Sequence, residues 1–110
     1  MTTNRLERLL TFLEDNPKDS FILFAIAKEH EKMGETERAL EHYLKIREND
    51  PQYVGLYYHL GKIYEQLQEV EKAFFTYKEG MAIARQAGDE HALSELAGAK
   101  LNLGDDEDFE

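Results

Sequence analysis

The sequence predicts an all-α fold of about six helices, organised as repeated helix–turn–helix units. Three observations support this prediction. The chain resembles itself at an offset of 34 residues, and apolar residues recur at helical spacing through most of its length. Apolar and polar residues nowhere alternate over the length of a strand. A fixed period of this size indicates one supersecondary unit that is copied and stacked, because each copy covers the apolar face of the next.

The repeat is visible when residues 16–48 are aligned with residues 50–82. The identical pairs are Pro17 with Pro51, Lys28 with Lys62, Glu31 with Glu65, Glu35 with Glu69, Glu37 with Glu71, Ala39 with Ala73, and Tyr43 with Tyr77. Conservative pairs lie between them, such as Ile26 with Leu60 and Ala27 with Gly61. The small residues suit close helix packing, and we expect Tyr43 and Tyr77 to fill the space that they leave in the neighbouring unit.

Three helices are predicted in the first half, over residues 3–14, 20–33 and 36–49. Pro17 disfavours helical geometry in the residue before it and ends the first helix. Gly34 stands where a left-handed cap would end the second. The side chains expected to point inward are Leu6, Leu9, Leu10 and Leu13, then Leu23, Ile26, Ala27 and His30, then Ala39, Leu40, Tyr43, Leu44 and Ile46.

Three further helices are predicted over residues 53–67, 69–87 and 90–103. Asp50 is expected to cap the first of them, with Pro51 at its first position. The second continues to a stop at Gly88. The side chains expected inward are Tyr57, Leu60, Gly61 and Tyr64, then Ala73, Phe74, Tyr77, Met81 and Ala84. Residues 105–110 form an acidic tail with one aromatic side chain.

Composition restricts the classes of function. The chain has 110 residues, a net charge of −10 and no cysteine, which excludes a disulfide framework, a thiolate nucleophile and a cysteine zinc site. Its lysines and arginines are interleaved with glutamate, so binding to nucleic acid or to an anionic membrane surface is not expected. The chain lacks an apolar run long enough to cross a bilayer and a secretory signal. These features fit a cytoplasmic protein.

Catalytic and metal-binding motifs are not expected either. The four histidines, His30, His42, His59 and His91, include no pair four residues apart on one helix, so we predict no metal site. His30 is expected to be a packing residue with its polar atoms satisfied. The glycines form no phosphate-binding loop, and neither serine lies in a nucleophile-elbow motif. We therefore predict a protein that is not an enzyme and has no cofactor.

The repeated positions resemble the tetratricopeptide repeat, a helix–turn–helix unit of 34 residues. The family pattern is matched by Leu23, Ile26-Ala27, His30, Ala39, Tyr43 and Pro51, and again by Tyr57, Leu60-Gly61, Tyr64, Ala73, Tyr77 and Gly80. The second repeat lacks the junction proline. The resemblance implies a right-handed superhelix (solenoid) over residues 1–104. Its parts would be a half-repeat over residues 3–19, full repeats over residues 20–53 and 54–87, and a capping half-repeat over residues 88–104.

The resemblance also implies non-catalytic protein–protein interaction, with the first helix of each repeat lining a concave groove. The residues this places in the groove are Phe21, Phe24, Lys28, Glu31, Tyr58, His59, Lys62, Glu65 and Gln66. A lysine follows Phe24 and Tyr58 by four residues in each case, so aromatic and cation should share a patch. Such a patch suits a peptide or helix of an unidentified partner protein. The alternative is that both aromatics only pack against a neighbouring helix.

The sequence also bears on other uses of this fold. The clamp by which some members grip chaperone carboxylates needs Lys and Asn where this chain has Phe24, Lys28 and His59, so that role is disfavoured. The acidic tail could bind its own groove through Lys28 and Lys62. The chain could also form a homodimer through the open side of the last helix or through Phe75 on the outer face.

Overall fold

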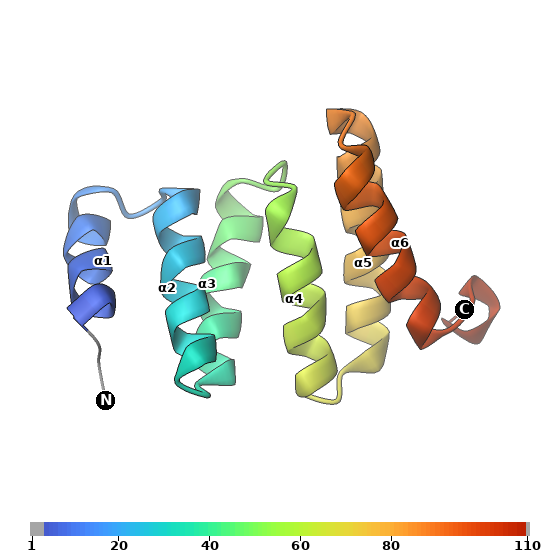
Figure 1. The fold of residues 1–110 in the computed structure, drawn as a ribbon, viewed down its shortest axis with the longest axis horizontal. Coiled ribbons are helices and arrows are strands. Elements are labelled where there is room, and N and C mark those ends of the chain that lie inside the picture. The colour runs from blue at the N-terminus through green and yellow to red at the C-terminus, as the bar shows by residue number, and fades with distance from the viewer. Residues whose placement is uncertain (1–3, 110) are drawn as a thin grey trace. The chain divides into compact units, whose positions relative to one another are not determined.

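The computed structural model describes residues 4–109, and over these it contains six α-helices, one short 3-10 helix and no strand. The helices are α1 (Asn4–Asp15), α2 (Ser20–Lys32), α3 (Thr36–Asn49), α4 (Gly55–Gln66), α5 (Val70–Ala87) and α6 (Glu90–Leu103), followed by the 3-10 helix η1 (Asp106–Phe109) (Figure 1). The predicted all-α class and helix number are confirmed. The predicted start of the first helix at residue 3 lies outside the described residues.

The chain divides into two compact units, residues 1–53 and 54–110. In the first unit α2 packs against both α1 and α3. The Asp19 side chain accepts a hydrogen bond from the Ile22 backbone N–H and caps α2, and Gly34 turns the chain after α2 with φ of +73°. The expected glycine stop is therefore confirmed, because a residue with a side chain is strained at that φ.

The core of the first unit lies between α2 and α3. All four side chains expected inward on α2 are buried, and so are Ala39, Tyr43 and Ile46 of α3. The expectation was only partly right for α1. Leu6 is its one buried residue, and Leu10 is exposed. The reason is geometric: α1 is covered by one helix, so only a narrow stripe of its apolar face is shielded.

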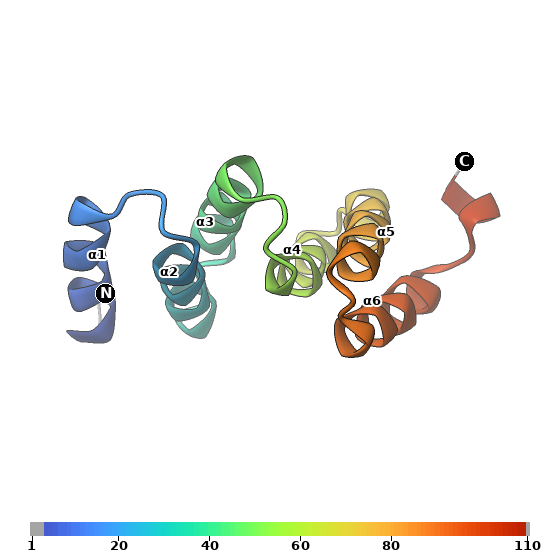
Figure 2. The same cartoon turned by 90° about the horizontal axis from the view of Figure 1, so that it is seen from above.

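In the second unit, α5 packs against α4 and α6, and α4 also touches α6 (Figure 2). All four side chains expected inward on α4 are buried, as are Ala73, Phe74, Tyr77 and Ala84 of α5. Met81 is only half-buried. Gly88 follows α5 with φ of +71°, and the Asp89 side chain caps α6 by accepting from the Ala92 N–H. The predicted stop of the long fifth helix is confirmed.

Two glycines let α4 and α5 approach closely. A Cβ at Gly61 would lie 2.1 Å from Tyr77 Cε1, and a Cβ at Gly80 would lie 2.4 Å from Tyr57 Cβ. Each aromatic ring therefore occupies the place of a missing side chain on the facing helix. The expectation that Tyr77 fills space in a neighbouring unit was wrong, since its ring packs on Gly61 of its own helix pair.

The turn before α4 also differs from the prediction. Asp50 does not cap α4: its backbone N–H bonds back to Ile46 at the end of α3, and its carboxylate accepts from the Ser20 hydroxyl at 2.8 Å. Residues 51–54 form the turn, and α4 begins at Gly55 without a side-chain cap. The carboxylate of Asp50 thus bonds to a residue of α2 that is 30 positions away in the sequence, and a local sequence pattern does not reveal such a contact.

Candidate functional site

The α2 face of the first unit carries Phe21, Phe24, Lys28 and Glu31. Phe21 lies in the first turn and is 72% exposed. Phe24 is half-buried, with its ring 5.7 Å from Tyr43 and 5.9 Å from Tyr53. Aromatic pairs at these centroid distances are favourable edge or tilted contacts. Phe24 therefore both packs on its neighbours and keeps part of its ring at the surface.

Glu31 joins this face to α3. The Lys28 ammonium lies 3.8 Å from Glu31 Oε2, and the Tyr43 hydroxyl donates a hydrogen bond to the same carboxylate. Burial and the neighbouring carboxylate raise the pKa of Tyr43, so its hydroxyl stays protonated and remains a donor. The buried tyrosine thus holds a half-exposed carboxylate in a defined position.

The α4 face of the second unit repeats this arrangement with Tyr58, Lys62 and Glu65. Lys62 Nζ lies 5.4 Å from the centroid of the Tyr58 ring and 3.6 Å from Glu65 Oε2. The Tyr77 hydroxyl donates to Glu65, and burial together with Glu65 raises the pKa of Tyr77. The expected pairing of aromatic and cation is thereby found on α4.

The remaining predicted residues lie at the edges of the α4 face. His59 is half-buried with its ring 5.7 Å from that of Tyr58. Gln66 is exposed at the last position of α4. The structure therefore brings Tyr58, His59, Lys62 and Glu65 together on one helix face, with Gln66 at its end.

One strongly buried charge was not predicted. Glu29 on α2 has a side chain only 4% exposed, and it lies 2.8 Å from Arg5 Nε of α1 and 3.6 Å from Lys32 Nζ. Buried carboxylates need such partners, since an isolated charge is costly to remove from water. The available sequence signal is its position on α2, directly before the inward-facing His30.

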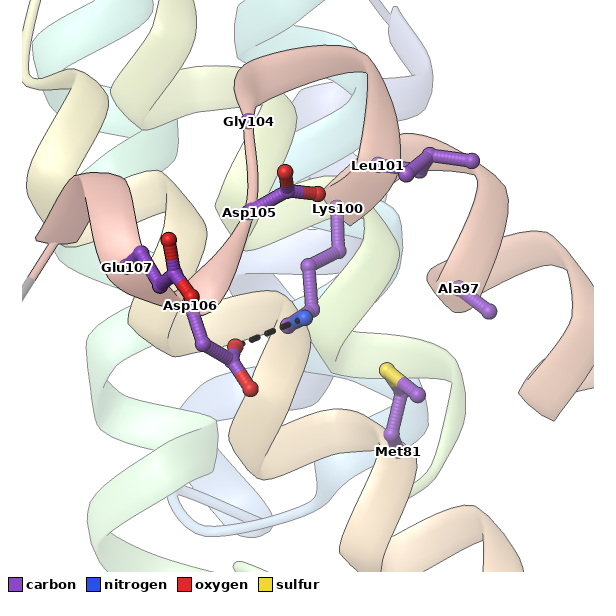
Figure 3. A pocket seen from close by; sticks show the side chains of 8 residues that line it. All are labelled: Met81, Ala97, Lys100, Leu101, Gly104, Asp105, Asp106 and Glu107. Atoms are coloured by element: carbon purple, nitrogen blue, oxygen red, sulfur yellow. Dashed lines mark ion pairs between the residues drawn. The ribbon is translucent and has the colours of Figure 1, made fainter.

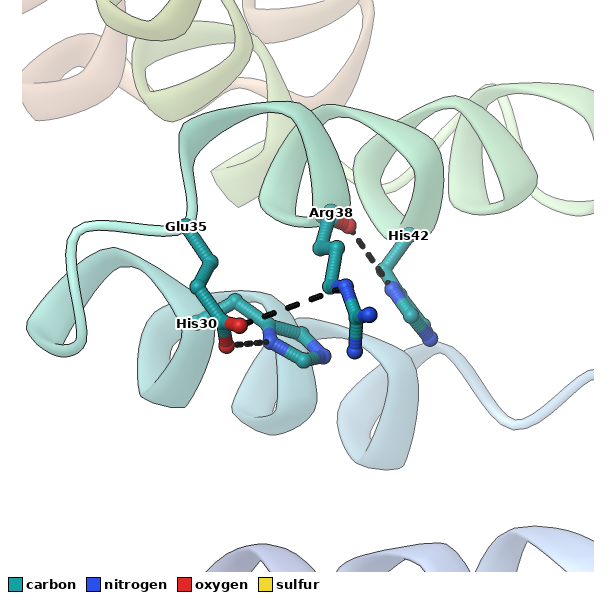
Figure 4. A network of polar contacts seen from close by, with 4 residues as sticks. All are labelled: His30, Glu35, Arg38 and His42. Carbon is teal, nitrogen blue, oxygen red and sulfur yellow. Dashed lines mark hydrogen bonds and ion pairs between the residues drawn. The ribbon is translucent and has the colours of Figure 1, made fainter. Parts of the chain in front are cut away.

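His30 belongs to a polar network between α2 and α3 (Figure 4). Its Nδ1–H donates to Glu35 Oε1 at 3.0 Å, and its ring lies 5.2 Å from that of His42. His42 Nδ1–H donates to the Arg38 carbonyl at 2.9 Å. The prediction of a satisfied packing histidine is confirmed, because His30 is buried and hydrogen-bonded.

The acidic tail does not extend as a featureless segment. It forms η1, in which Phe109 stacks on Phe74 of α5 with ring centroids 4.1 Å apart. Asp106 lies 3.0 Å from Lys100 Nζ and 3.8 Å from Lys78 Nζ. The tail therefore pairs with Lys78 and Lys100, whereas the possibility raised from the sequence was binding through Lys28 and Lys62.

Two further kinds of feature are absent from the part of the chain that the structure describes. Residues 4–109 hold no group of three or more His, Cys, Asp or Glu side chains placed to bind a metal ion. Within the same range, every helix is too short or too polar to cross a membrane.

Comparison with known proteins identifies the class. A family model described as tetratricopeptide repeat matches residues 54–86. A tetratricopeptide repeat domain protein from Salinibacter ruber, solved by crystallography, is 46% identical with a TM-score of 0.75, covering 77% of this chain and 96% of its own. A solution NMR structure with the same description and source gives the same identity and TM-score, covering 79% and 88%. No curated protein matches the sequence.

A protein from Bordetella parapertussis shares the fold at 24% identity, with a TM-score of 0.78 and coverage of 94% of this chain and 89% of its own. The chain belongs to the tetratricopeptide repeat family. Members of this family are generally non-catalytic modules for protein–protein interaction. The fold predicted from the resemblance, a helical repeat, is confirmed.

Proposed function

We propose that the chain binds a peptide or helix of a partner protein through the exposed face of α2, and in the same way through the exposed face of α4. The observation that carries the proposal is the duplicated network of a half-buried aromatic, a lysine and a tyrosine-held glutamate. It occurs as Lys28–Glu31–Tyr43 in one unit and as Lys62–Glu65–Tyr77 in the other.

The network supports binding because its charges are held in place before a ligand arrives. Each tyrosine hydroxyl orients a carboxylate, and each carboxylate lies beside a lysine. Side chains that are already ordered lose less conformational entropy when a partner docks. Half-exposed Phe24 and Tyr58 would supply the aromatic anchors, and the charges would align the polar groups of a peptide backbone or side chain. The absence of cysteine fits a cytoplasmic setting for this interaction.

Affinity capture from native lysate would test the proposal with variants that spare the core. Phe21→Ala and Lys62→Gln remove an exposed ring and one charge, so neither should unfold its unit. We expect the double variant to recover at least tenfold less of the main captured protein than the wild type does. Phe12→Ala with Lys45→Gln is the matched control, because it removes an exposed ring of α1 and a lysine of α3.

Equal recovery of every captured protein by the wild type and the Phe21/Lys62 variant would overturn the proposal. So would an equal loss in the Phe12/Lys45 control, which would assign the effect to total charge and apolar area. Circular dichroism of each variant must show unchanged helix content, so that the loss reports the surface.

Self-association is the second candidate, and the exposed apolar side chains of the second unit favour it. Leu101 of α6 is 68% exposed, and Phe75 on α5 is also exposed, as predicted. A homodimer of ordinary two-fold symmetry would bury such side chains. Light scattering over a concentration series would show a mass rising to twice 12.8 kDa, and Leu101→Gln would abolish the rise. A constant monomer mass would exclude this candidate.

A further inference from the structure

The tail of the second unit docks back on α5 and α6 by a turn that requires glycine. α6 ends at Leu103, and Gly104 follows with φ of +144°. A Cβ at this position would lie 2.7 Å from Asp108 Oδ2 and 3.1 Å from Phe109 Cε2. Asp108 also closes η1 by accepting from the Asp105 backbone N–H at 2.7 Å. The turn therefore presents Asp106 and Phe109 to the helices as a defined pair.

The receiving surface, which we name the tail site, consists of Phe74 and Lys78 of α5 and Lys100 of α6. Phe109 stacks on Phe74 with an angle of 18° between the rings. Lys100 Nζ lies 4.7 Å from the centroid of the same Phe74 ring and also contacts Asp106 (Figure 3). Lys100 is mostly buried, so its charge is directed by packing at an acidic group beside an aromatic one.

An open pocket of about 550 Å³ adjoins this contact, with the tail as one wall and α5 and α6 as the other. Met81, Ala97 and Leu101 line its helical side, and Asp105, Asp106 and Glu107 line the tail side (Figure 3). The tail segment therefore occupies only part of the surface that α5 and α6 offer, and apolar contacts remain unused beside it.

We propose that the tail site is a second peptide-binding site, distinct from the faces of α2 and α4. It would recognise an acidic segment of a partner protein in which an aromatic residue follows an aspartate by three positions. The chain's own segment 105–109 occupies the site in the free protein. Charge complementarity identifies the ligand chemistry: two lysines meet one carboxylate, and an aromatic ring covers Phe74.

The tail is suited to exchange because its polar contacts are exposed. Asp106 is 58% exposed while it pairs with both lysines, and ion pairs in such surroundings hold weakly. The hydrogen bond from Lys100 lowers the pKa of Asp106, so the carboxylate is charged at neutral pH. A tethered segment competes at millimolar effective concentration. A partner peptide that also contacts Met81 and Leu101 would gain additional apolar contacts and could therefore displace the tail.

Fluorescence anisotropy on the full chain tests the proposal. The probe is a labelled, C-terminally amidated peptide with the sequence of residues 104–109. The host is a tail-released chain that carries Asp106→Asn and Phe109→Ala and therefore leaves the site open. We expect the probe to bind this chain at least tenfold more tightly than it binds the wild type, whose own tail competes. Binding should weaken as salt rises, since charge pairs carry part of it.

Site specificity is tested in the tail-released chain. Lys100→Gln should weaken probe binding at least tenfold, and Lys78→Gln, at a more exposed position, should weaken it severalfold. Lys45→Gln and Lys62→Gln remove the same charge elsewhere and should leave binding unchanged. The Lys62 control also separates this site from the α4 face, so either proposal can fail alone. A probe with alanine in place of its phenylalanine should not bind.

Three results of the binding experiment would overturn the proposal, and a fourth would come from sedimentation. The three binding results are no probe binding to the tail-released chain at 1 mM, equal binding by that chain and the wild type, and equal binding by the Lys78 and Lys45 variants. Because Lys78 is exposed, its variant tests the site even where Lys100→Gln disturbs packing. A wild-type dimer in sedimentation that Phe109→Ala dissociates would assign the tail site to a second copy of the chain and overturn the assignment to a partner protein.

Discussion

Single residues set the distances between helices. Gly61 and Gly80 allow tyrosine rings to lie against the backbone of the facing helix, and a methyl group at either would overlap a ring. Tyr77 has a second task, because its hydroxyl orients Glu65 at the surface. Packing in the core and the position of a surface charge are thus linked through one side chain, and Tyr43 does the same for Glu31.

Gly61→Ala should destabilise the protein by about 1–3 kcal/mol, because the new Cβ would lie 2.1 Å from the Tyr77 ring and overpacks the core. Gly98→Ala is the matched control in α6, where a Cβ meets nothing within 4 Å. It should stabilise the chain by about 0.5–1 kcal/mol through helix propensity. Urea denaturation measures both, and the same sign for the two variants would contradict the packing assigned to Gly61.

His42 should make stability depend on pH. Burial lowers its pKa from the ordinary value of 6.5, so the unfolded chain binds this proton more readily than the folded one. Stability should therefore be full above that ordinary value and fall as pH drops through it towards the lower folded-state pKa. Glu35, whose pKa is lowered by the hydrogen bond from His30, loses its contribution only in more acidic solution.

His42→Gln should flatten the dependence of the urea midpoint on pH between about pH 7.5 and 5, a window centred near the ordinary histidine pKa. His91→Gln, at an exposed position of α6, is the control and should keep the wild-type dependence. Identical pH curves for the wild type and the His42 variant would show that this histidine does not carry the effect.

At the scale of elements, each helix is held by what covers it. α2 contacts α1 and α3, and it contains six buried residues, whereas α1 contains one. The charge pair between Arg5 and Glu29 adds a polar contact between α1 and α2. Helices with few buried contacts open at lower free energy than the core of their domain.

Arg5→Ala should destabilise the first unit by about 1–3 kcal/mol, less than the full loss of a buried pair because Lys32 still faces Glu29. Hydrogen exchange should accelerate most in α1. Arg8→Ala removes an exposed arginine from the same helix and should change exchange little. Equal acceleration in both variants would mean that the ion pair does not hold α1.

At the scale of the whole molecule, the same network appears twice with a spacing of 34 residues. The two networks lie in separate compact units and share no residue. Repeat proteins of this kind gain stability approximately as a sum over their units. A change in one network should therefore leave the other network unaffected.

Tyr43→Phe and Tyr77→Phe should each cost about 1–3 kcal/mol, since a hydrogen bond to a charged group is lost. The double variant should show the sum of the two within about 0.5 kcal/mol. Chemical denaturation of the wild type, the two single variants and the double variant gives the free energies of unfolding for this double-mutant cycle. A coupling clearly larger than this would contradict the independence of the two networks.

The sequence alone determined the class of fold and most of the core. Helical periodicity, glycine stops and a 34-residue repeat are local or near-local signals, so the six helices and nearly all inward side chains of α2, α4 and α5 followed from them. The pairing of Tyr58 with Lys62 on α4 followed in the same way. Spacing along one helix decides which side chains share a face.

Only the tertiary structure decided which residues of different helices contact one another. Asp50 bonds to Ser20 of α2 instead of capping α4, Arg5 neutralises Glu29 across two helices, and Tyr77 meets Gly61 of its own pair. The acidic tail finds Lys78, Lys100 and Phe74, although its sequence pattern is that of a solvated segment. These contacts depend on how elements pack together, and residue periodicity within one element carries no information about its partners.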